Sequence, residues 1–193
     1  MGKLFKWIVI IAAAIFFLAV FALVLFFGQG GSKPSDVIPQ TDQKNNMDGM
    51  KLTSPLFLNN GNFPAAFTCD GRETNPPLDI VDVPKEAKSL ALVLRDPDAP
   101  AGTFIHWIMW NIDPATKQIR QDSVPQGALQ GMATSGKNGY VGPCPPGGTH
   151  RYVFTLYALD ALLDLPASTT AGQLDAAMAG HILAQTDLHA RYR

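Results

Sequence analysis

The sequence predicts an all-β protein: a β-sandwich with a short C-terminal helix, preceded by one N-terminal transmembrane helix. Three observations predict this class. Between residues 51 and 193, short runs of β-forming residues alternate with Gly/Pro clusters, one late segment has helical periodicity, and residues 7–27 are continuously apolar. Strands and helices do not alternate along the chain, which argues against a Rossmann or barrel α/β fold.

Residues 1–28 are predicted to form an uncleaved signal anchor. A helix over residues 7–27 would cover about 31 Å, the thickness of the hydrocarbon core of a bilayer. Lys3 and Lys6 precede this run, so the positive-inside rule places the N-terminus in the cytoplasm. A cleaved signal peptide has a shorter apolar run, and an all-apolar buried helix needs a larger protein around it. We therefore expect a single-pass membrane protein with an extracytoplasmic domain over residues 51–193.

Residues 29–50 are predicted to be a flexible linker, because Gly, Ser, Pro, Asn and Asp dominate them. The whole chain has 15 Lys+Arg against 16 Asp+Glu and a net charge of -1. This balance provides no basic field, so nucleic acid is excluded as a partner. The content of 47% hydrophobic and 16% charged residues excludes intrinsic disorder.

Three strands are predicted to lie in the middle of a covered sheet. Residues 90–94, 105–112 and 151–159 are apolar on both strand faces, and the first two end at Asp-Pro turn signals. Residues 68–69 and 80–81 are predicted as shorter strands next to Asp-Gly and Asn-Pro-Pro turns.

One helix is predicted over residues 170–185. Thr170 and Gln173 have the spacing of a capping box. Leu174, Met178 and Ile182 recur at helical spacing. Such a helix would close one end of the sandwich.

Four polar residues are candidates for a functional site. His106 lies within an apolar strand, on the face shared with positions 108 and 110, where a core histidine is the simpler interpretation. His150 follows a Gly/Pro loop and opens a strand, a position that can face either a pocket or solvent. Asp96 and Asp98 flank Pro97 after a buried strand. Asp and Pro are also common turn residues, so these residues can equally form an ordinary turn. His181, on the predicted helix, and His189 are interpreted as structural or solvent-facing.

These residues predict a pocket but not a reaction. A carboxylate and two histidines from three segments could bind a metal ion, relay protons or bind an anion. The sequence contains no H-E-x-x-H, C-x-x-C or G-x-S-x-G motif, no P-loop and no dinucleotide fingerprint. We therefore expect neither catalysis nor a cofactor or metal.

Cys69 and Cys144 are the only two cysteines. Export would permit a disulfide between them, and closing that loop would stabilise the fold by about 4 kcal/mol. The alternative is a pair of free, partly buried thiols, and the sequence leaves both open.

An ordered set of motifs covers the chain from about residue 52 to its end. The motifs are Phe67-Thr68-Cys69-Asp70-Gly71, Asn75-Pro76-Pro77-Leu78, Asp96-Pro97-Asp98-Ala99-Pro100, His106-Trp107, Asn111, Gly139-Tyr140-x-Gly142-Pro143, Pro145-Pro146-Gly147 and His150-Arg151-Tyr152. Together they resemble the phosphatidylethanolamine-binding protein family, in particular its bacterial and archaeal, Raf kinase inhibitor-like branch.

The resemblance implies a Greek-key β-sandwich with a small anion pocket at one end. It assigns ligand binding to Asp96, His106, Pro145, Pro146, His150 and Tyr152, with Asp98 and Gly147 in support. The implied ligands carry phosphate-type groups, such as phosphoethanolamine and phospholipid head groups. Because some family members inhibit kinases or proteases, the alternative is a protein target bound at the pocket rim. A metal-dependent hydrolase built on Asp96, His106 and His150 is the least favoured hypothesis.

Overall fold

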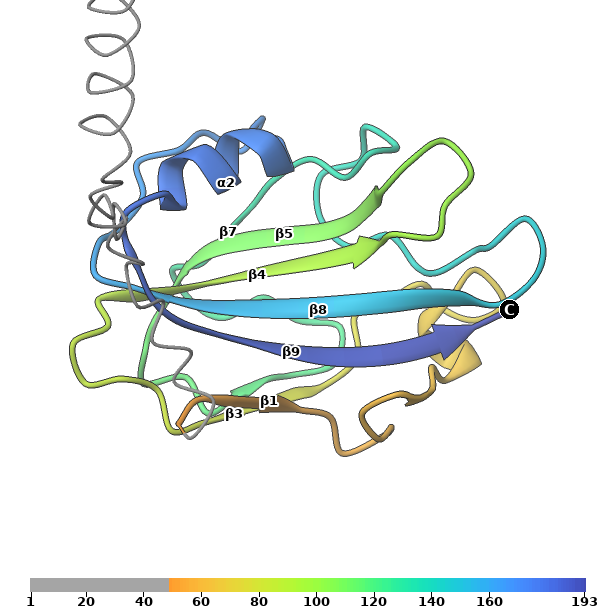
Figure 1. The fold of residues 1–193 in the computed structure, drawn as a ribbon, viewed down its shortest axis with the longest axis horizontal. Helices are drawn as coiled ribbons and strands as arrows, with labels where there is room; N and C mark the ends of the chain where they lie inside the picture. Colours follow the sequence, from red (N-terminus) through yellow and green to blue (C-terminus); the bar gives the residue numbers. More distant parts are fainter. Residues whose placement is uncertain (1–48) are drawn as a thin grey trace, which may run out of the picture. The chain divides into compact units, whose positions relative to one another are not determined.

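The computed structural model describes residues 49–193, and two β-sheets dominate this part of the chain (Figure 1). The strands are β1 (Lys51–Thr53), β2 (Gly61–Asn62), β3 (Leu78–Val81), β4 (Ser89–Asp96), β5 (Phe104–Ile112), β6 (Gln118–Ile119), β7 (Leu129–Gln130), β8 (His150–Leu159) and β9 (Ile182–Tyr192), and the helices are the 3₁₀ turn η1 (Ala65–Phe67) and α2 (Ala171–Met178). One sheet has the order β2-β9-β8-β4-β5-β7 and the other β1-β3-β6. The predicted anchor, and all of the predicted linker except its last two residues, lie outside the described residues. Within residues 49–193, no helix has the length and apolarity to span a bilayer.

The three predicted central strands are confirmed as β4, β5 and β8. Strand β4 lies between β5 and β8 and pairs antiparallel with both. Leu92 and Val93, which point to opposite faces of β4, are both fully buried. Continuous apolar runs are typical of strands that are covered on both faces, and this is the environment of β4.

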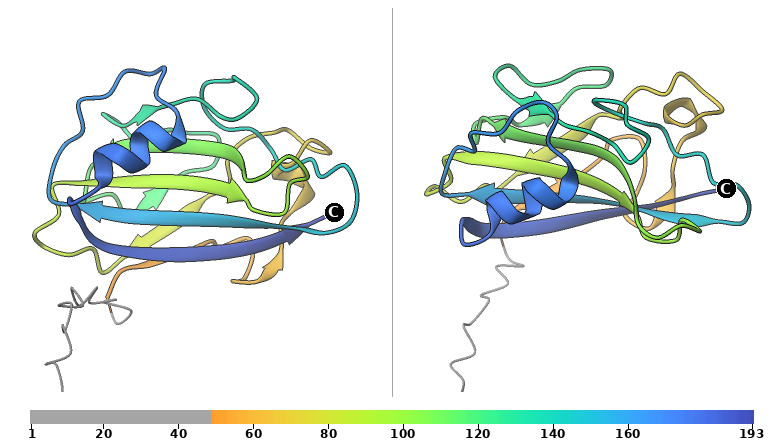
Figure 2. Two further views of the ribbon diagram at one scale, coloured as in Figure 1. Left: turned by 45° about the horizontal axis from the view of Figure 1, so that its top comes forward. Right: turned by 90° about the horizontal axis from the view of Figure 1, so that it is seen from above.

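Two hydrophobic cores cover the two faces of the large sheet. The main core fills the space between the sheets, where Leu78 and Ile80 of β3 meet residues such as Leu92 and Trp107. The second core lies on the outer face, beneath α2. Figure 2 shows α2 lying across that face. The described chain therefore has a sandwich of two sheets with one short helix outside it.

The predicted helix begins as expected but ends earlier. The backbone N–H of Thr170 donates to Oε1 of Gln173 at 2.9 Å, so the capping box is confirmed. The helix stops at Met178, and Gly180 adopts a φ of +83°, a conformation that suits glycine and ends a helix. The expected continuation to residue 185 is therefore wrong.

Strand β9 takes the place of that helical extension. Its inward positions are small or apolar, with Ala184, Leu188 and Ala190 buried, while the intervening positions are mostly polar. This two-residue period is that of a strand. The strand predicted at residues 68–69 is also wrong, because these residues follow η1 in a turn.

A β-bulge in β5 falls at His106. Leu94 pairs with Trp107, but the next residue of β4, Arg95, pairs with Ile105. His106 is the extra residue and has no partner on β4. A bulge of this kind re-aims a side chain and is common beside functional sites.

Candidate functional site

Four polar side chains gather where β4 ends and β8 begins. The two strands are antiparallel, so Asp96 at the end of β4 comes next to His150 and Tyr152 at the start of β8. The bulge brings His106 of β5 to the same place: its ring lies edge-on to that of Tyr152, with centroids 5.3 Å apart. The prediction that His106 shares a face with Ile108 is therefore wrong, because Ile108 packs in the core beneath α2.

Asp96 and His150 form a buried pair. Nδ1 of His150 donates to Oδ2 of Asp96 at 2.7 Å, and the two residues are 6% and 3% exposed. The other oxygen, Oδ1, accepts from the backbone N–H of Asp98 at 2.8 Å. Because a carboxylate accepts, the proton on Nδ1 is fixed, and the second ring nitrogen, Nε2, remains for another partner.

The His106 ring is held in one orientation and kept neutral. Its Nδ1–H donates to the carbonyl oxygen of Val141 at 2.8 Å. Burial lowers the pKa of this histidine, against the raising effects of the Val141 bond and of the Asp96 charge. In the neutral ring Nε2 is therefore a hydrogen-bond acceptor.

Tyr152 carries a fully buried hydroxyl. Burial first, then the charge of Asp96 and the close approach of its carboxylate to this hydroxyl, raise the pKa of Tyr152, so the hydroxyl stays protonated. The contact with Asp96 does not meet the distance and angle of a hydrogen bond, so among residues 49–193 this hydroxyl lacks a well-formed partner. A buried donor left without an acceptor costs about 1–3 kcal/mol.

The loop that precedes β8 is tied to η1 and its following turn. Cys69 and Cys144 form a disulfide, which decides between the two alternatives left by the sequence. The backbone N–H of Cys69 also donates to the carbonyl of Pro143 at 3.1 Å. Further along the loop, Pro145 is half-buried and Pro146 is exposed.

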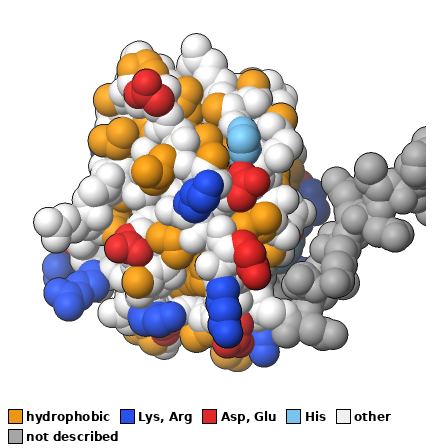
Figure 3. Space-filling view, turned by 90° about the vertical axis from the view of Figure 1, so that its left-hand side faces the viewer, with side chains coloured by type: hydrophobic (Ala, Val, Ile, Leu, Met, Phe, Trp, Pro, Cys, Tyr) orange, Lys and Arg blue, Asp and Glu red, His pale blue; other side chains and the backbone are white. Residues whose placement is uncertain are grey.

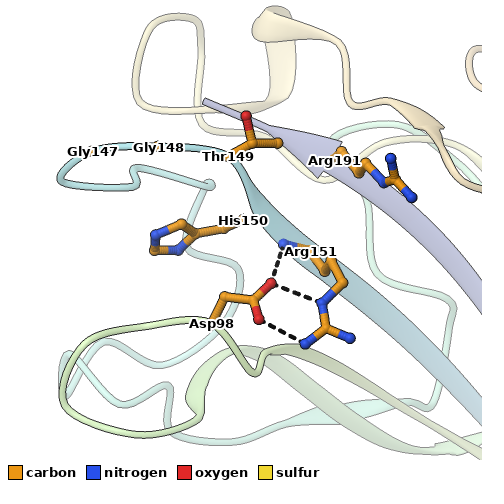
Figure 4. A pocket seen from close by; sticks show the side chains of 7 residues that line it. All are labelled: Asp98, Gly147, Gly148, Thr149, His150, Arg151 and Arg191. Carbon is orange, nitrogen blue, oxygen red and sulfur yellow. Dashed lines mark hydrogen bonds and ion pairs between the residues drawn. The ribbon is translucent and has the colours of Figure 1, made fainter.

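An open cavity of about 590 Å³ lies at this end of the large sheet (Figure 4). It is lined by Asp98, Gly147, Gly148, Thr149, His150, Arg151 and Arg191. Of the six predicted ligand residues only His150 lines it. Asp96, His106 and Tyr152 form a buried cluster next to it, and the two predicted supporting residues, Asp98 and Gly147, are part of its wall.

Asp98 is bonded to the start of β8 through Arg151. Its Oδ2 accepts from the backbone N–H and Nε of Arg151, each at 2.9 Å, and its Oδ1 accepts from Nη2 at 2.6 Å. These bonds lower the pKa of Asp98 to about 2. Arg191 was not predicted as a site residue, because its place at the cavity depends on β9, and the first residues of that strand were predicted as helix.

The other two histidines lie elsewhere. His181 lies in the turn after α2, where its Nδ1 donates to Oδ1 of Asp160 at 2.7 Å, and His189 is part of β9. Across residues 49–193, no three His, Cys, Asp or Glu side chains are arranged to hold a metal ion.

The fold and the polar cluster define a class: a β-sandwich binding protein with its candidate site at the ends of the central strands. The family model of phosphatidylethanolamine-binding proteins matches residues 53–193. The chain belongs to the phosphatidylethanolamine-binding protein family, among its bacterial and archaeal members.

Relatives and solved structures agree with this assignment. A UPF0098 protein from Methanothermobacter thermautotrophicus is 44% identical over 149 residues, which cover 75% of this chain and 99% of that protein. The structure of a phosphatidylethanolamine-binding protein homologue from Chlamydia trachomatis, CT736, has a TM-score of 0.73 and 41% identity, covering 75% of this chain and 97% of that one. The Escherichia coli family member YbcL has a TM-score of 0.71 and 25% identity, covering 75% and 98%. These relatives consist of little more than the domain described here.

Proposed function

We propose that this protein binds small molecules with a phosphate-type group, such as phosphoethanolamine or a phospholipid head group, and does not catalyse a reaction. The observation that carries the proposal is the unpartnered hydroxyl of Tyr152, buried beside His106 and the Asp96–His150 pair. A ligand oxygen that accepts from this hydroxyl would remove the cost of leaving it unpaired.

The ring nitrogens supply the rest of the proposed site. The His150 ring keeps its Nδ1–H on Asp96, which leaves Nε2 as the ring atom for the ligand. The His106 ring, which is neutral in the unliganded protein, donates from Nε2 only when it takes up a proton. When a histidine ring carries a proton on both nitrogens, its hydrogen bond to an oxyanion is short and strong. A site with two histidines therefore favours an oxyanion that is itself protonated, or one whose binding favours protonation of the rings.

Attachment to a membrane through residues 7–27 is part of the proposal. It is supported by the length and apolarity of this run and by Lys3 and Lys6 before it. In that topology the binding domain lies outside the cytoplasm, where the Cys69–Cys144 disulfide is stable.

A titration of phosphoethanolamine that follows the four histidine ring signals by NMR tests the proposal. We expect saturable shifts for His106 and His150, with His181 and His189 unchanged as internal references. His150→Gln is expected to abolish binding, whereas the matched variant His189→Gln, in β9, is expected to bind normally. Unchanged ring signals for His106 and His150 at millimolar phosphoethanolamine would contradict the assigned site.

An inhibitor that binds a protease or kinase through the pocket rim is the second candidate. The observation that favours it is the exposure of Gly147, Gly148 and Thr149 around the open cavity. A protein partner captured from membrane extract and retained when both His106 and His150 are replaced would support the rim. A partner lost in that variant would favour the anion site.

A further inference from the structure

The loop that leads into β8 is fastened to the rest of the domain at one point. Hydrogen bonds hold Pro143 before this loop and His150 after it. Within the part of the chain that the structure describes, the segment from Cys144 to Thr149 forms no hydrogen bond. The disulfide from Cys144 to Cys69 is therefore the cross-link that ties this loop to its neighbours.

The loop has little else to keep it in place. Pro146, Gly147, Gly148 and Thr149 are exposed, and Pro145 is half-buried. A Cβ atom added to Gly147 or Gly148 would meet no atom within 4 Å, so the loop backbone borders open space there. Gly148 has a φ of +74°, a conformation that glycine adopts without strain. The two prolines restrict the chain locally, but they do not attach it to the domain.

The same loop borders the proposed binding site. Residues 147–149 line the open cavity, and His150 follows them directly. In Figure 4 the loop extends on the side to which the His150 ring points. At the other end of the loop, Cys144 comes shortly after Val141, whose carbonyl accepts from the ring of His106. The position of this loop therefore affects the surroundings of both histidines.

The disulfide is accessible to a reductant, because both Cys69 and Cys144 are exposed. Exposed disulfides are more easily reduced than enclosed ones, and regulatory disulfides are of this kind. A dithiol attacks one sulfur and forms a mixed disulfide, and its second thiol then attacks that bond and frees the protein. Two electrons and two protons pass to the protein, which gains two thiols, while the dithiol leaves as a disulfide.

We propose that the Cys69–Cys144 bridge is a redox switch for ligand binding at His150. The reductant class is a dithiol, such as the Cys-x-x-Cys site of a thiol–disulfide oxidoreductase. The oxidised bridge holds the loop as one wall of the site, and reduction lets the loop take other positions. If the reduced loop occupies the binding position a tenth of the time, the apparent dissociation constant rises about tenfold. This inference rests on the proposed function for its ligand and adds a means of control.

Reduction is expected to release the loop without unfolding the domain. The backbone N–H of Cys69 donates to the carbonyl of Pro143 at 3.1 Å, and the hydroxyl of Tyr140 donates to the carbonyl of Phe67 at 2.7 Å. Neither bond involves a sulfur atom. They keep the turn after η1 against residues 140–143 in both redox states.

The opposite end of β8 provides an internal reference. Figure 3 shows this end, where Lys and Arg side chains lie next to Asp and Glu. His181 binds Asp160 there through its Nδ1. The 10 residues of β8 separate that pair from the bridge, about 30 Å along the strand. The ring signal of His181 should therefore not respond to a local change at the bridge.

Calorimetric titration of phosphoethanolamine into the full-length chain in a non-ionic detergent, before and after treatment with dithiothreitol, tests the switch. The reduced protein is expected to bind about tenfold more weakly, and reoxidation should restore the affinity. In the unliganded protein, reduction should shift the NMR ring signals of His106 and His150 and leave that of His181 in place.

Two variants separate the switch from a general loss of stability. The double variant Cys69→Ser/Cys144→Ser should bind like the reduced protein and should not respond to dithiothreitol. The matched control is Tyr140→Phe, which removes the neighbouring hydrogen bond to Phe67 but keeps the bridge. It should retain the affinity of the oxidised wild type and the response to dithiothreitol.

Equal affinity of the oxidised and reduced proteins would overturn the switch and leave the proposed function intact. A bridge that dithiothreitol reduces only in the urea-unfolded protein would also overturn it, as would loss of the folded His181 signal on reduction. If the oxidised protein does not bind phosphoethanolamine, the proposed function fails. A shift of the His150 signal on reduction would then still support a redox-controlled site, and an unchanged signal would overturn it.

Discussion

The substitution Tyr152→Phe is expected to stabilise the unliganded protein while it weakens ligand binding. Tyr152 is fully buried, and its hydroxyl has no hydrogen-bond partner among the described residues. Removing an unsatisfied buried hydroxyl recovers part of a cost of about 1–3 kcal/mol. Allowing for the small void that is left, the gain is about 1 kcal/mol, or about 2–4 °C in Tm for a domain of this size. Loss of a hydrogen bond to a charged ligand weakens binding roughly tenfold to a hundredfold.

The matched control is the same substitution at Tyr140. Its hydroxyl is also buried, but it donates to the carbonyl of Phe67 at 2.7 Å. Tyr140→Phe therefore leaves a carbonyl without its donor and is expected to destabilise the protein by about 1–2 kcal/mol. The two variants delete the same atom and should change stability in opposite directions.

Urea unfolding without ligand and calorimetric titration of phosphoethanolamine measure the two effects for each variant. A Tyr152→Phe protein that is clearly less stable than wild type would refute the reasoning, because it would mean that the hydroxyl already has an acceptor, with Asp96 the nearest candidate. Unchanged affinity in this variant would remove Tyr152 from the proposed binding site.

Three further predictions follow from the titratable groups and the disulfide. Burial lowers the pKa of His106, so the unfolded chain binds more protons than the folded one. The unfolding free energy should therefore fall as the pH drops below about 6.5. Urea titrations across this range should show a weaker pH dependence in His106→Asn than in wild type, and an equal pH dependence in the two proteins would contradict the assignment to His106. The pKa of Asp98 is lowered to about 2, so its stabilising contribution is present above the unfolded pKa and is lost as the pH falls through about 2. Asp98→Asn should cost less than about 1 kcal/mol at pH 7, since the pair with Arg151 is exposed, and the difference from wild type should shrink in acid. Replacing Cys69 and Cys144 by alanine should cost about 4 kcal/mol; an unchanged urea midpoint would show that the bridge contributes little.

Much of the fold could be predicted because the central strands have continuous apolar sequences that are easy to recognise. A strand covered on both faces needs apolar residues at successive positions, and residues 90–94 and 151–159 have them. The turn residues after β4 and β5 set the ends of those strands closely. The sequence also placed the acid and the two histidines at three segments that do converge.

The C-terminal part was predicted less well because a four-residue and a two-residue hydrophobic pattern overlap there. Leu174, Met178 and Ile182 recur every four residues, and this spacing is compatible with helix. The same residue Ile182 also begins a two-residue alternation that continues through Ala184 and Leu188. Pairing with β8 decides the outcome in favour of a strand, and such long-range pairing is not encoded in a local window.

The orientation of His106 could not be predicted for a related reason. Strict alternation assigns it to the outer face, and a single bulge between the Arg95 and Leu94 pairings reverses that assignment. The position of Arg191 depends in turn on the register of β9. The orientation of His106 and the position of Arg191 both depend on strand pairing, whereas the sequence motifs show only which residues are present.

His150 connects the buried polar cluster with the open cavity. It is the residue that belongs both to the buried cluster, through Asp96, and to the wall of the open cavity. A buried carboxylate is tolerated only when it is paired, so removing the His150 ring leaves Asp96 without that partner and also removes the ring nitrogen proposed to bind the ligand. Removing the side chain of Arg191 leaves the buried cluster as it is. Substitution of His150 should therefore abolish binding of phosphoethanolamine and also lower the stability of the unliganded protein, whereas substitution of Arg191 should leave that stability unchanged.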